Sequence, residues 1–356
     1  MACTVWRERS CTGSFLEVAE GFFFDFAMAS GMRVSKLSTL SYYQFNGSTS
    51  KELNVRRMDV SFPSGNSRCE AWFYLPDTAA TAPRPCVVVA HGIGAIRQVR
   101  LAAYAARFTK AGLAVVTFDY RHWGASMGAP RFLCSISKQH EDINAAIDFA
   151  QHQPDIDPSQ IFLFGTSFGG GHALAVGAQR PDLAGVISQC TVSDCLAVAR
   201  RASLRQVVRW VSAGMVDQTR ALLGLSPRYI KLAGNPGESA LMTELDAEMR
   251  YKAMLDEPSP WRNLIAARLM LWLPLYRPIK YAASIESPLL MVVCDRDEIC
   301  PASYAVRAAE LAPRGRAVHF DSSHFEIYFG ELFERAVSAM LQFLTETTLR
   351  PQESAP

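Results

Sequence analysis

The chain reads QIFLFGTSFGGGHALAVGA over residues 160–178, and this stretch decides the fold. The apolar residues 160–164 predict a short buried strand, and the small residues that follow from 172 predict a helix. Between them, Gly165 and Gly169 flank Ser167 in a G-x-S-x-G pattern. A serine on so sharp a turn is held in a strained backbone conformation with its hydroxyl presented, and the glycines let the neighbouring backbone pack closely. The stretch therefore predicts an activated serine at the edge of a sheet.

Strand patterns and helix patterns alternate on both sides of this elbow. We expect strands at 53–62, 69–75, 86–90, 113–118, 160–164, 184–188, 289–293 and 316–320, and helices near 98–111 and 138–152. The first two strands surround a turn signal at 63–66 and predict a hairpin at the sheet edge. Runs that are apolar on both faces are typical of a mostly parallel sheet covered by helices, so the predicted class is α/β.

The alternation stops after residue 188 and resumes at 288, which divides the chain. We expect an N-terminal extension at 1–52, a core at 53–190 and 286–348, a helical cap insertion at 191–285, and a C-terminal tail at 349–356. The insertion is rich in Trp, Met, Leu and Arg and is punctuated by prolines, which favours a helical cap laid over the strand ends.

Composition excludes several classes of function. The 356 residues include 36 basic and 34 acidic side chains, so no global charge predicts a nucleic-acid partner. Nine cysteines without C-x-x-C pairs favour free thiols in a reducing compartment, and we expect a cytoplasmic protein with no metal or cofactor. The apolar stretch at 15–28 is interrupted by Glu17, Glu20 and Asp25, which argues against stable membrane insertion. A helix packed on the core is expected there, with a lid or membrane-surface role as the alternative.

A serine nucleophile needs a base, and the base needs an orienting acid. His324 follows the last strand on a loop and is the expected base. Asp297 follows the strand at 289–293 and is the favoured acid. Asp295 is the alternative acid, and if Asp297 is the acid we expect Asp295 to cap or brace the loop. All of these residues lie at strand carboxyl ends, the edge where open α/β sheets bind ligands.

The oxyanion of a tetrahedral intermediate needs two backbone N–H donors. We expect one from Phe168, directly after the serine, and one from Ile93, in the glycine-rich loop after the strand at 86–90. His91 in that loop is expected to brace it rather than act as a second base, and it is also a candidate substrate-lining residue. His122 and Trp123 follow the strand at 113–118 and are candidate substrate-lining residues, although a structural role is the stronger expectation.

With these residues assembled, the chain resembles the α/β-hydrolase superfamily over residues 53–346. The block DYRHWG at 119–124, the segment WRNLIAAR at 261–268, YRP at 276–278 and the loop at 294–301 look similar to the fungal polyketide transferase and thiohydrolase family. That resemblance implies release or transfer of an acyl chain held as a thioester on a polyketide synthase carrier domain, with water or a small molecule as acceptor. It also implies roles for Ser167 as nucleophile, Asp297 as acid and His324 as base.

Two features of the insertion bear on such a substrate. Its large apolar side chains suit an extended acyl chain, although packing on the core explains them equally well: Leu241, Met242, Met249, Met254, Trp261 and Trp272. One expected helix near 195–213 puts Arg201, Arg205 and Arg209 on a stripe, which we interpret either as a docking face for an acidic carrier domain or as a solvated basic face.

Three functions remain open on the sequence. The first is acyl release or transfer from a carrier-bound thioester in secondary metabolism. The second is a general carboxylic-ester hydrolase or small peptidase with the same three residues. The third is a non-catalytic binding protein on the same fold, against which the intact serine, histidine and aspartate argue.

Overall fold

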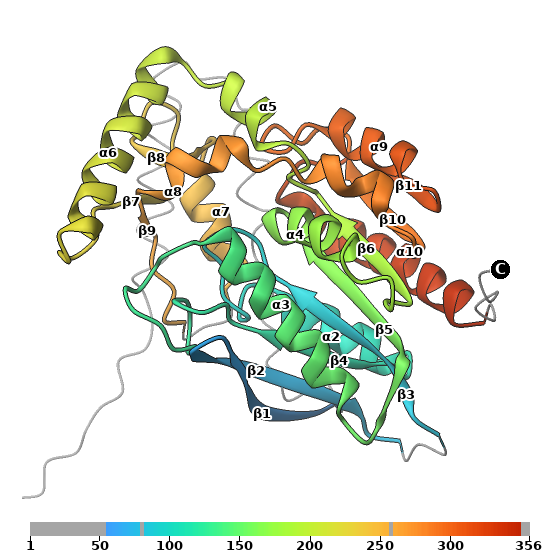
Figure 1. The fold of residues 1–356 in the computed structure, drawn as a ribbon. Helices are drawn as coiled ribbons and strands as arrows, with labels where there is room; N and C mark the ends of the chain where they lie inside the picture. Colours follow the sequence, from blue (N-terminus) through green and yellow to red (C-terminus); the bar gives the residue numbers. More distant parts are fainter. Residues whose placement is uncertain (1–54, 79–81, 256–258, 350–356) are drawn as a thin grey trace, which may run out of the picture. The chain divides into compact units, whose positions relative to one another are not determined.

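The computed structural model describes residues 55–78, 82–255 and 259–349 (Figure 1). Its centre is an eight-stranded sheet of order β1-β2-β4-β3-β5-β6-β10-β11. The strands are β1 (Val55–Ser64), β2 (Ser67–Pro76), β3 (Arg84–Ala90), β4 (Ala114–Phe118), β5 (Ile156–Thr166), β6 (Gly185–Gln189), β10 (Leu289–Cys294) and β11 (Gly315–Phe320). Each strand expected from an apolar run is present, with its bounds shifted by a few residues.

Strand direction brings the chemistry to one edge of the sheet. β2 is antiparallel to its neighbours β1 and β4, and all the other neighbouring pairs are parallel. The structure thus confirms the expected hairpin and the mostly parallel sheet. Because parallel strands end at the same edge, the loops after β3, β5, β10 and β11 meet there.

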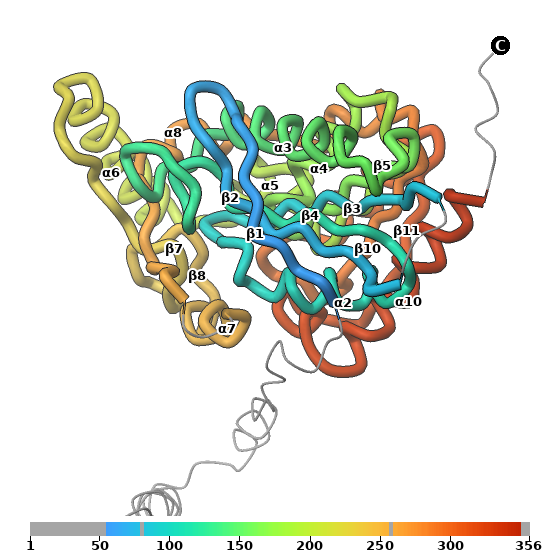
Figure 2. The backbone as a smooth tube through the Cα atoms, turned by 90° about the horizontal axis from the view of Figure 1, so that it is seen from below, coloured from blue at the N-terminus to red at the C-terminus, as the bar shows by residue number. Residues whose placement is uncertain are grey.

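Helices cover both faces of the sheet (Figure 2). α2 (Leu101–Lys110) and α10 (Gly330–Thr348) lie on one face, and α3 (Ile136–Gln151) and α4 (Phe168–Gly177) lie on the other. α9 (Ala302–Leu311) packs against β10 and β11. Every residue of β4 and of β10 is buried, which is why these strands read as continuous apolar runs and not as alternating ones.

The insertion between β6 and β10, hereafter the cap (residues 191–285), contains strands as well as helices. It contains α5 (Cys195–Arg200), α6 (Leu204–Leu222), α7 (Ala247–Ala253) and α8 (Leu269–Trp272), with 3-10 turns at Leu273–Leu275 and Pro278–Ser284. It also holds a small sheet of order β8-β7-β9, formed by β7 (Tyr229–Gly234), β8 (Ala240–Thr243) and β9 (Ile265–Ala266). Strands of 4 and 2 residues are too short to show an alternating pattern, so the sequence did not indicate them.

The single cap helix expected near 195–213 is two helices. The chain turns at 201–203, and the Ser203 hydroxyl accepts a hydrogen bond from the backbone N–H of Gln206 at 3.2 Å, which caps the start of α6. α6 then continues to Leu222. Arg201 therefore lies outside α6, while Arg205 and Arg209 lie in its first two turns.

Two polar side chains of α6, those of Gln206 and Asp217, are buried. The Asp217 carboxylate is fully buried and accepts hydrogen bonds from Arg268 and from the backbone N–H of Arg228. The Gln206 amide donates to the carbonyl of Ala240 at 3.1 Å. The exposed side chains of α6 are mostly apolar: Leu204, Val208, Val211, Met215, Val216 and Leu222. We refer to these six exposed apolar side chains as the α6 stripe; Arg205, Ser212 and Thr219 are exposed on the same helix.

The expectations for the extension at 1–52 and for the tail beyond 349 fall outside the described residues. Within the described part of the chain, no helix is both long and apolar enough to cross a membrane. Seven cysteines there are free and buried.

Candidate active site

Ser167 lies on the turn between β5 and α4 with φ 57° and ψ −118°. A positive φ costs a non-glycine residue on the order of 1–3 kcal/mol and persists only where the surroundings impose it. The two flanking glycines allow the turn. A Cβ on Gly165 would lie 2.0 Å from the carbonyl oxygen of Gly169, and a Cβ on Gly169 would lie 2.4 Å from that of Ala90. The sharp elbow that the motif predicts is therefore present.

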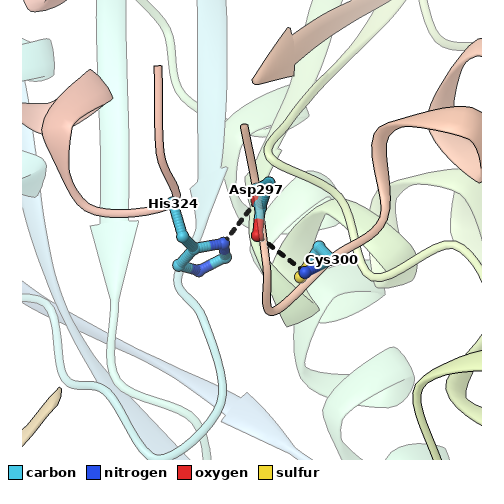
Figure 3. A group of neighbouring side chains, drawn as sticks. All are labelled: Asp297, Cys300 and His324. Carbon is cyan, nitrogen blue, oxygen red and sulfur yellow. Dashed lines mark hydrogen bonds and ion pairs between the residues drawn. The ribbon is translucent and has the colours of Figure 1, made fainter. Parts of the chain in front are cut away.

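Ser167, His324 and Asp297 form one hydrogen-bonded row. His324 Nε2 lies 3.1 Å from Ser167 Oγ. On the other side of the ring, His324 Nδ1 lies 2.7 Å from Asp297 Oδ2, as Figure 3 shows. All three side chains are buried at the carboxyl edge of the sheet. The carboxylate can only accept, so Nδ1 donates to it, and the lone pair of Nε2 faces the serine hydroxyl. This is the arrangement that a base needs in order to take the serine proton.

The two candidate acids separate in space. Asp297 Oδ1 accepts the backbone N–H groups of Ile299 and Cys300 at 2.9 and 2.7 Å, which fixes the carboxylate with its other oxygen on His324. Asp295 Oδ1 instead lies 2.8 Å from Nδ1 of His319, in a pair that is largely exposed. The structure brings the favoured aspartate to the histidine and leaves the alternative as a brace between strand ends.

The surroundings of His324 favour the imidazolium that forms when the ring accepts the serine proton. Burial alone would lower the pKa of the imidazole, but the neighbouring Asp297 carboxylate outweighs it and holds the pKa of His324 well above its ordinary value. The imidazolium that forms when the serine gives up its proton is therefore stabilised in place. The same effect stabilises the charged pair that builds up in the transition state.

A small cavity of about 30 Å³ opens at Ser167. Ser167 and His324 lie on the core side, and the cap supplies Met242, Tyr251 and Met254. Its lining combines apolar side chains such as Met242 and Met254 with the polar side chains of His91, Thr166 and Tyr328. The cap residues cover the serine and limit the access of water to it.

The two expected oxyanion donors flank the serine. Phe168 is the first residue of α4, so its backbone N–H has no acceptor within the helix. Ile93 lines the same cavity from the loop after β3. This loop approaches closely, since a Cβ on Gly92 would lie 3.2 Å from that of Ser167.

Contacts from the cap fix the loop that carries Ile93 (residues 91–95, hereafter the oxyanion loop). The Tyr251 hydroxyl donates to the carbonyl of Ile93 at 2.9 Å, and the indole N–H of Trp261 donates to that of Gly94 at 2.9 Å. The two aromatic rings stack on each other with centroids 4.9 Å apart. The side chain of Leu232 packs directly against Gly94, which has a φ of +63°. Sequence reasoning missed these contacts because they join residues more than 150 positions apart.

His91 lines the cavity as part of the oxyanion loop. Its ring packs edge-on against Tyr120, and Nδ1 lies 3.0 Å from the carbonyl of Gly92. Burial lowers the pKa of His91 to about 4, so the ring is neutral near pH 7. These contacts match the bracing role expected from the sequence.

His122 and Trp123 are not among the residues that line the cavity at Ser167. His122 Nδ1 lies 2.9 Å from the carbonyl of Pro130, and its Nε2 lies 3.3 Å from Lys138 Nζ. The Trp123 indole donates to the carbonyl of Leu133 at 2.9 Å. Both side chains hold the loop after β4 in shape, as the structural interpretation predicted.

The six apolar cap residues divide into four groups, of which one is Leu241, which is partly buried against the hydrophobic core. Met242 and Met254 line the catalytic cavity. Trp261 lines a second, more open cavity, together with Trp123. Met249 and Trp272 are more than half exposed. Only part of the apolar cap surface therefore faces the serine.

The fold and this site define the protein as an α/β-hydrolase enzyme. The chain belongs to the Hydrolase_4 family, described as serine aminopeptidase S33, whose model matches residues 81–320.

Known proteins that resemble the chain differ in their named functions. The quorum-quenching protein AidA of Acinetobacter baumannii is 39% identical over 287 residues, which cover 81% of this chain and 94% of AidA. The thiohydrolase aneE of Aspergillus aculeatus is 25% identical over 274 residues, which cover 74% of this chain and 85% of aneE. The crystal structure of the α/β hydrolase GrgF from Penicillium sp. superposes with a TM-score of 0.71 at 23% identity, covering 82% of this chain and 99% of GrgF.

Proposed function

We propose that this enzyme cleaves or transfers acyl groups through a covalent acyl-serine intermediate on Ser167. The observation that carries the proposal is the hydrogen-bonded row from Ser167 Oγ through His324 to Asp297, placed on a strained elbow in front of a small cavity.

The geometry supports a two-step reaction. Ser167 Oγ attacks the acyl carbon while its proton passes to His324 Nε2, and the carbonyl oxygen becomes an oxyanion held by the N–H groups of Phe168 and Ile93. The oxyanion collapses, the bond to the leaving group breaks, and His324 returns the proton to the leaving group. Water or an alcohol then attacks the acyl-serine by the same route in reverse. Asp297 stays ionised throughout and keeps the imidazole in the required tautomer.

For the substrate we propose a polyketide-type acyl chain carried as a thioester. The apolar contributions of Met242 and Met254 to the cavity suit such a chain. The names of the related thiohydrolase and of the related polyketide transferases support the same class. The free thiols of the described cysteines are consistent with action in the cytoplasm, where such carriers work.

A second candidate is hydrolysis of a small ester-type signalling molecule. It is supported by the 39% identity with AidA, which exceeds the 25% identity with aneE. The chemistry at Ser167 is the same for both candidates, so the difference lies in which acyl group fits beneath the cap.

Carrier docking is proposed for the α6 stripe. The only acidic residue of α6, Asp217, is buried, so its exposed face carries apolar side chains, Arg205, Ser212 and Thr219 but no acidic side chain. Arg209 donates to the carbonyl of Gly237, and Arg201 donates to that of Glu298, while Arg205 is exposed in the first turn. A basic, apolar surface on the cap is complementary to an acidic carrier domain. Arg205→Glu should weaken transfer from a carrier-bound thioester and leave turnover of the free pantetheine thioester unchanged, and equal loss on both would refute docking here.

The proposed reaction is tested by turnover of a substrate panel with wild type and Ser167→Ala. The panel holds acyl-pantetheine thioesters of increasing length, simple esters, an acyl lactone and an aminoacyl amide. We expect Ser167-dependent turnover with the highest kcat/KM on a thioester. A preference for the lactone or a simple ester would select the second candidate, and turnover that survives Ser167→Ala would refute the mechanism.

A further inference from the structure

Cys300 lies beside the catalytic residues without a part in the proposed chemistry. One ring nitrogen of His324, a carboxylate oxygen of Asp297 and the sulfur of Cys300 all lie within 4.8 Å of one another, and all three residues are buried (Figure 3). Nitrogen, carboxylate oxygen and thiolate sulfur are the three ligand types that zinc takes in proteins. In the described part of the chain, no other group of three such side chains comes together.

We propose that Asp297, Cys300 and His324 form an inhibitory zinc site that switches off the base of the active site. Ligands of a tetrahedral zinc ion lie about 3.3–3.8 Å apart for bonds of about 2.0–2.3 Å. Side-chain displacements of about an ångström therefore suffice to close the upper limit of 4.8 Å and to open the 2.7 Å between His324 Nδ1 and Asp297 Oδ2. The ion needs no backbone movement, because the loop after β10 already holds Asp297 and Cys300 against each other: the Cys300 N–H donates to Asp297 Oδ1 at 2.7 Å.

Charge balance favours Zn²⁺ in this buried position. The Asp297 carboxylate and the Cys300 thiolate carry two negative charges, which neutralise the dication, and neutral imidazole completes the protein ligands. Burying a balanced set of charges avoids most of the desolvation cost of a lone ion. Binding releases the thiol proton of Cys300 to solvent, and the imidazole proton leaves Nδ1 for solvent while Nε2 takes one up, so the imidazole stays neutral and no electrons are transferred.

Zinc bound at this site would reverse the direction of the hydrogen bond between His324 and Ser167. His324 Nδ1 faces Asp297 and is the nitrogen next to the metal position. A neutral imidazole that binds zinc through Nδ1 carries its proton on Nε2. Nε2 then faces Ser167 as a donor and no longer accepts the serine proton, so the acyl-serine cannot form. The inhibition depends on the proposed function, whereas binding of the metal does not.

Two measurements on chelator-treated protein test the site. In the first, zinc is titrated into a chromogenic ester assay with wild type, Cys300→Ala and the matched control Cys134→Ala, which removes another buried thiol. Wild type and Cys134→Ala should lose activity and recover it with EDTA. Cys300→Ala should need at least about tenfold more zinc, relative to its own zinc-free rate, because even outer-shell partners are worth about 10–100-fold in metal affinity.

In the second measurement, Co²⁺ serves as the probe and the thiolate-to-cobalt absorption is recorded. We expect the band in wild type and in Cys134→Ala and its loss in Cys300→Ala. An equal zinc midpoint for wild type and Cys300→Ala, or a cobalt band absent from wild type or retained without Cys300, would overturn the proposal. If the ester assay shows no Ser167-dependent activity, the proposed function fails and the cobalt band alone decides the metal site.

Discussion

The hydroxyl of Tyr251 in the cap donates to the carbonyl of Ile93 in the oxyanion loop at 2.9 Å. Tyr251 also lines the cavity at Ser167, so one side chain contacts the substrate space and fixes the loop that supplies an oxyanion donor. The cap is therefore coupled to the catalytic step and does more than cover the site. This relationship leads to the first two predictions.

Tyr251→Phe should lower kcat by about tenfold, because a lost hydrogen bond of about 1–1.5 kcal/mol loosens the position of Ile93 when charge develops on the substrate oxygen. KM should change little, since the ring remains in the cavity wall. Steady-state kinetics measure both parameters, and Tyr281→Phe, at a tyrosine that is 40% exposed, is the matched control. A rise in KM with unchanged kcat would show that Tyr251 acts on the substrate alone.

Gly94→Ala should destabilise the fold by about 1–3 kcal/mol more than Gly237→Ala. Both glycines have positive φ, at +63° and +89°, so both substitutions pay a similar backbone cost. Only at Gly94 would the new Cβ collide, at 2.4 Å from Leu232 Cδ2, whereas nothing lies within 4 Å of a Cβ at Gly237. Urea unfolding gives the two free energies of unfolding.

The double variant Gly94→Ala with Leu232→Ala checks the cause of that difference. Removing the leucine side chain makes room for the new methyl group, so the two single effects should not add. Fully additive losses would mean that contact with Leu232 is not what excludes a side chain at Gly94.

Asp297→Asn should reduce kcat by about 10⁴, because an asparagine holds the imidazole in the wrong tautomer. Asp295→Asn should change kcat by less than about twofold, since its partner is the exposed His319. Each variant replaces one carboxylate oxygen by an amide nitrogen, and the two positions lie two residues apart in the same loop. Each variant therefore serves as the control for the other. Comparable losses in the two would contradict the assignment of Asp297 as the acid.

Stability should fall as pH drops below about 6.5. Burial lowers the pKa of His91, His122 and His140 to about 4 each and that of His172 well below its ordinary value. The unfolded chain binds these protons near pH 6.5 and the folded chain does not, so each histidine removes up to about 1.4 kcal/mol per pH unit between 6.5 and its folded pKa. His324 acts in the opposite direction, because its pKa is raised.

Urea unfolding at pH 7.5, 6.0 and 5.0 measures that loss. His122→Gln keeps a polar side chain in the loop after β4 and removes one titrating group, so the dependence on pH should become shallower. A free energy of unfolding that is independent of pH over this range would mean that these histidines are protonated in the folded protein.

Much of the candidate site could be predicted from short sequence motifs. The elbow around Ser167 and the loops that follow β10 and β11 are each recognisable within about ten residues, and their meeting at one edge of the sheet follows from the parallel direction of the strands. The cap was less predictable. Strands of two and four residues are too short to show an alternating pattern in the sequence. In α6 the buried residues include polar ones and many exposed residues are apolar, and this reversal depends on the distant partners of Asp217 and Gln206. Contacts such as Tyr251 to Ile93 or Cys300 beside His324 arise only when loops far apart in sequence meet.

The most direct test of the account is the mass of the intact protein after brief mixing with an acyl-pantetheine thioester. Wild type should gain the mass of one acyl group, Ser167→Ala should gain none, and His324→Ala should acylate far more slowly. An acyl adduct on the Ser167→Ala variant would show that another residue is the nucleophile. Absence of any adduct and of Ser167-dependent turnover with thioesters, esters and lactones alike would contradict the acyl-serine mechanism and leave a binding protein on a hydrolase fold.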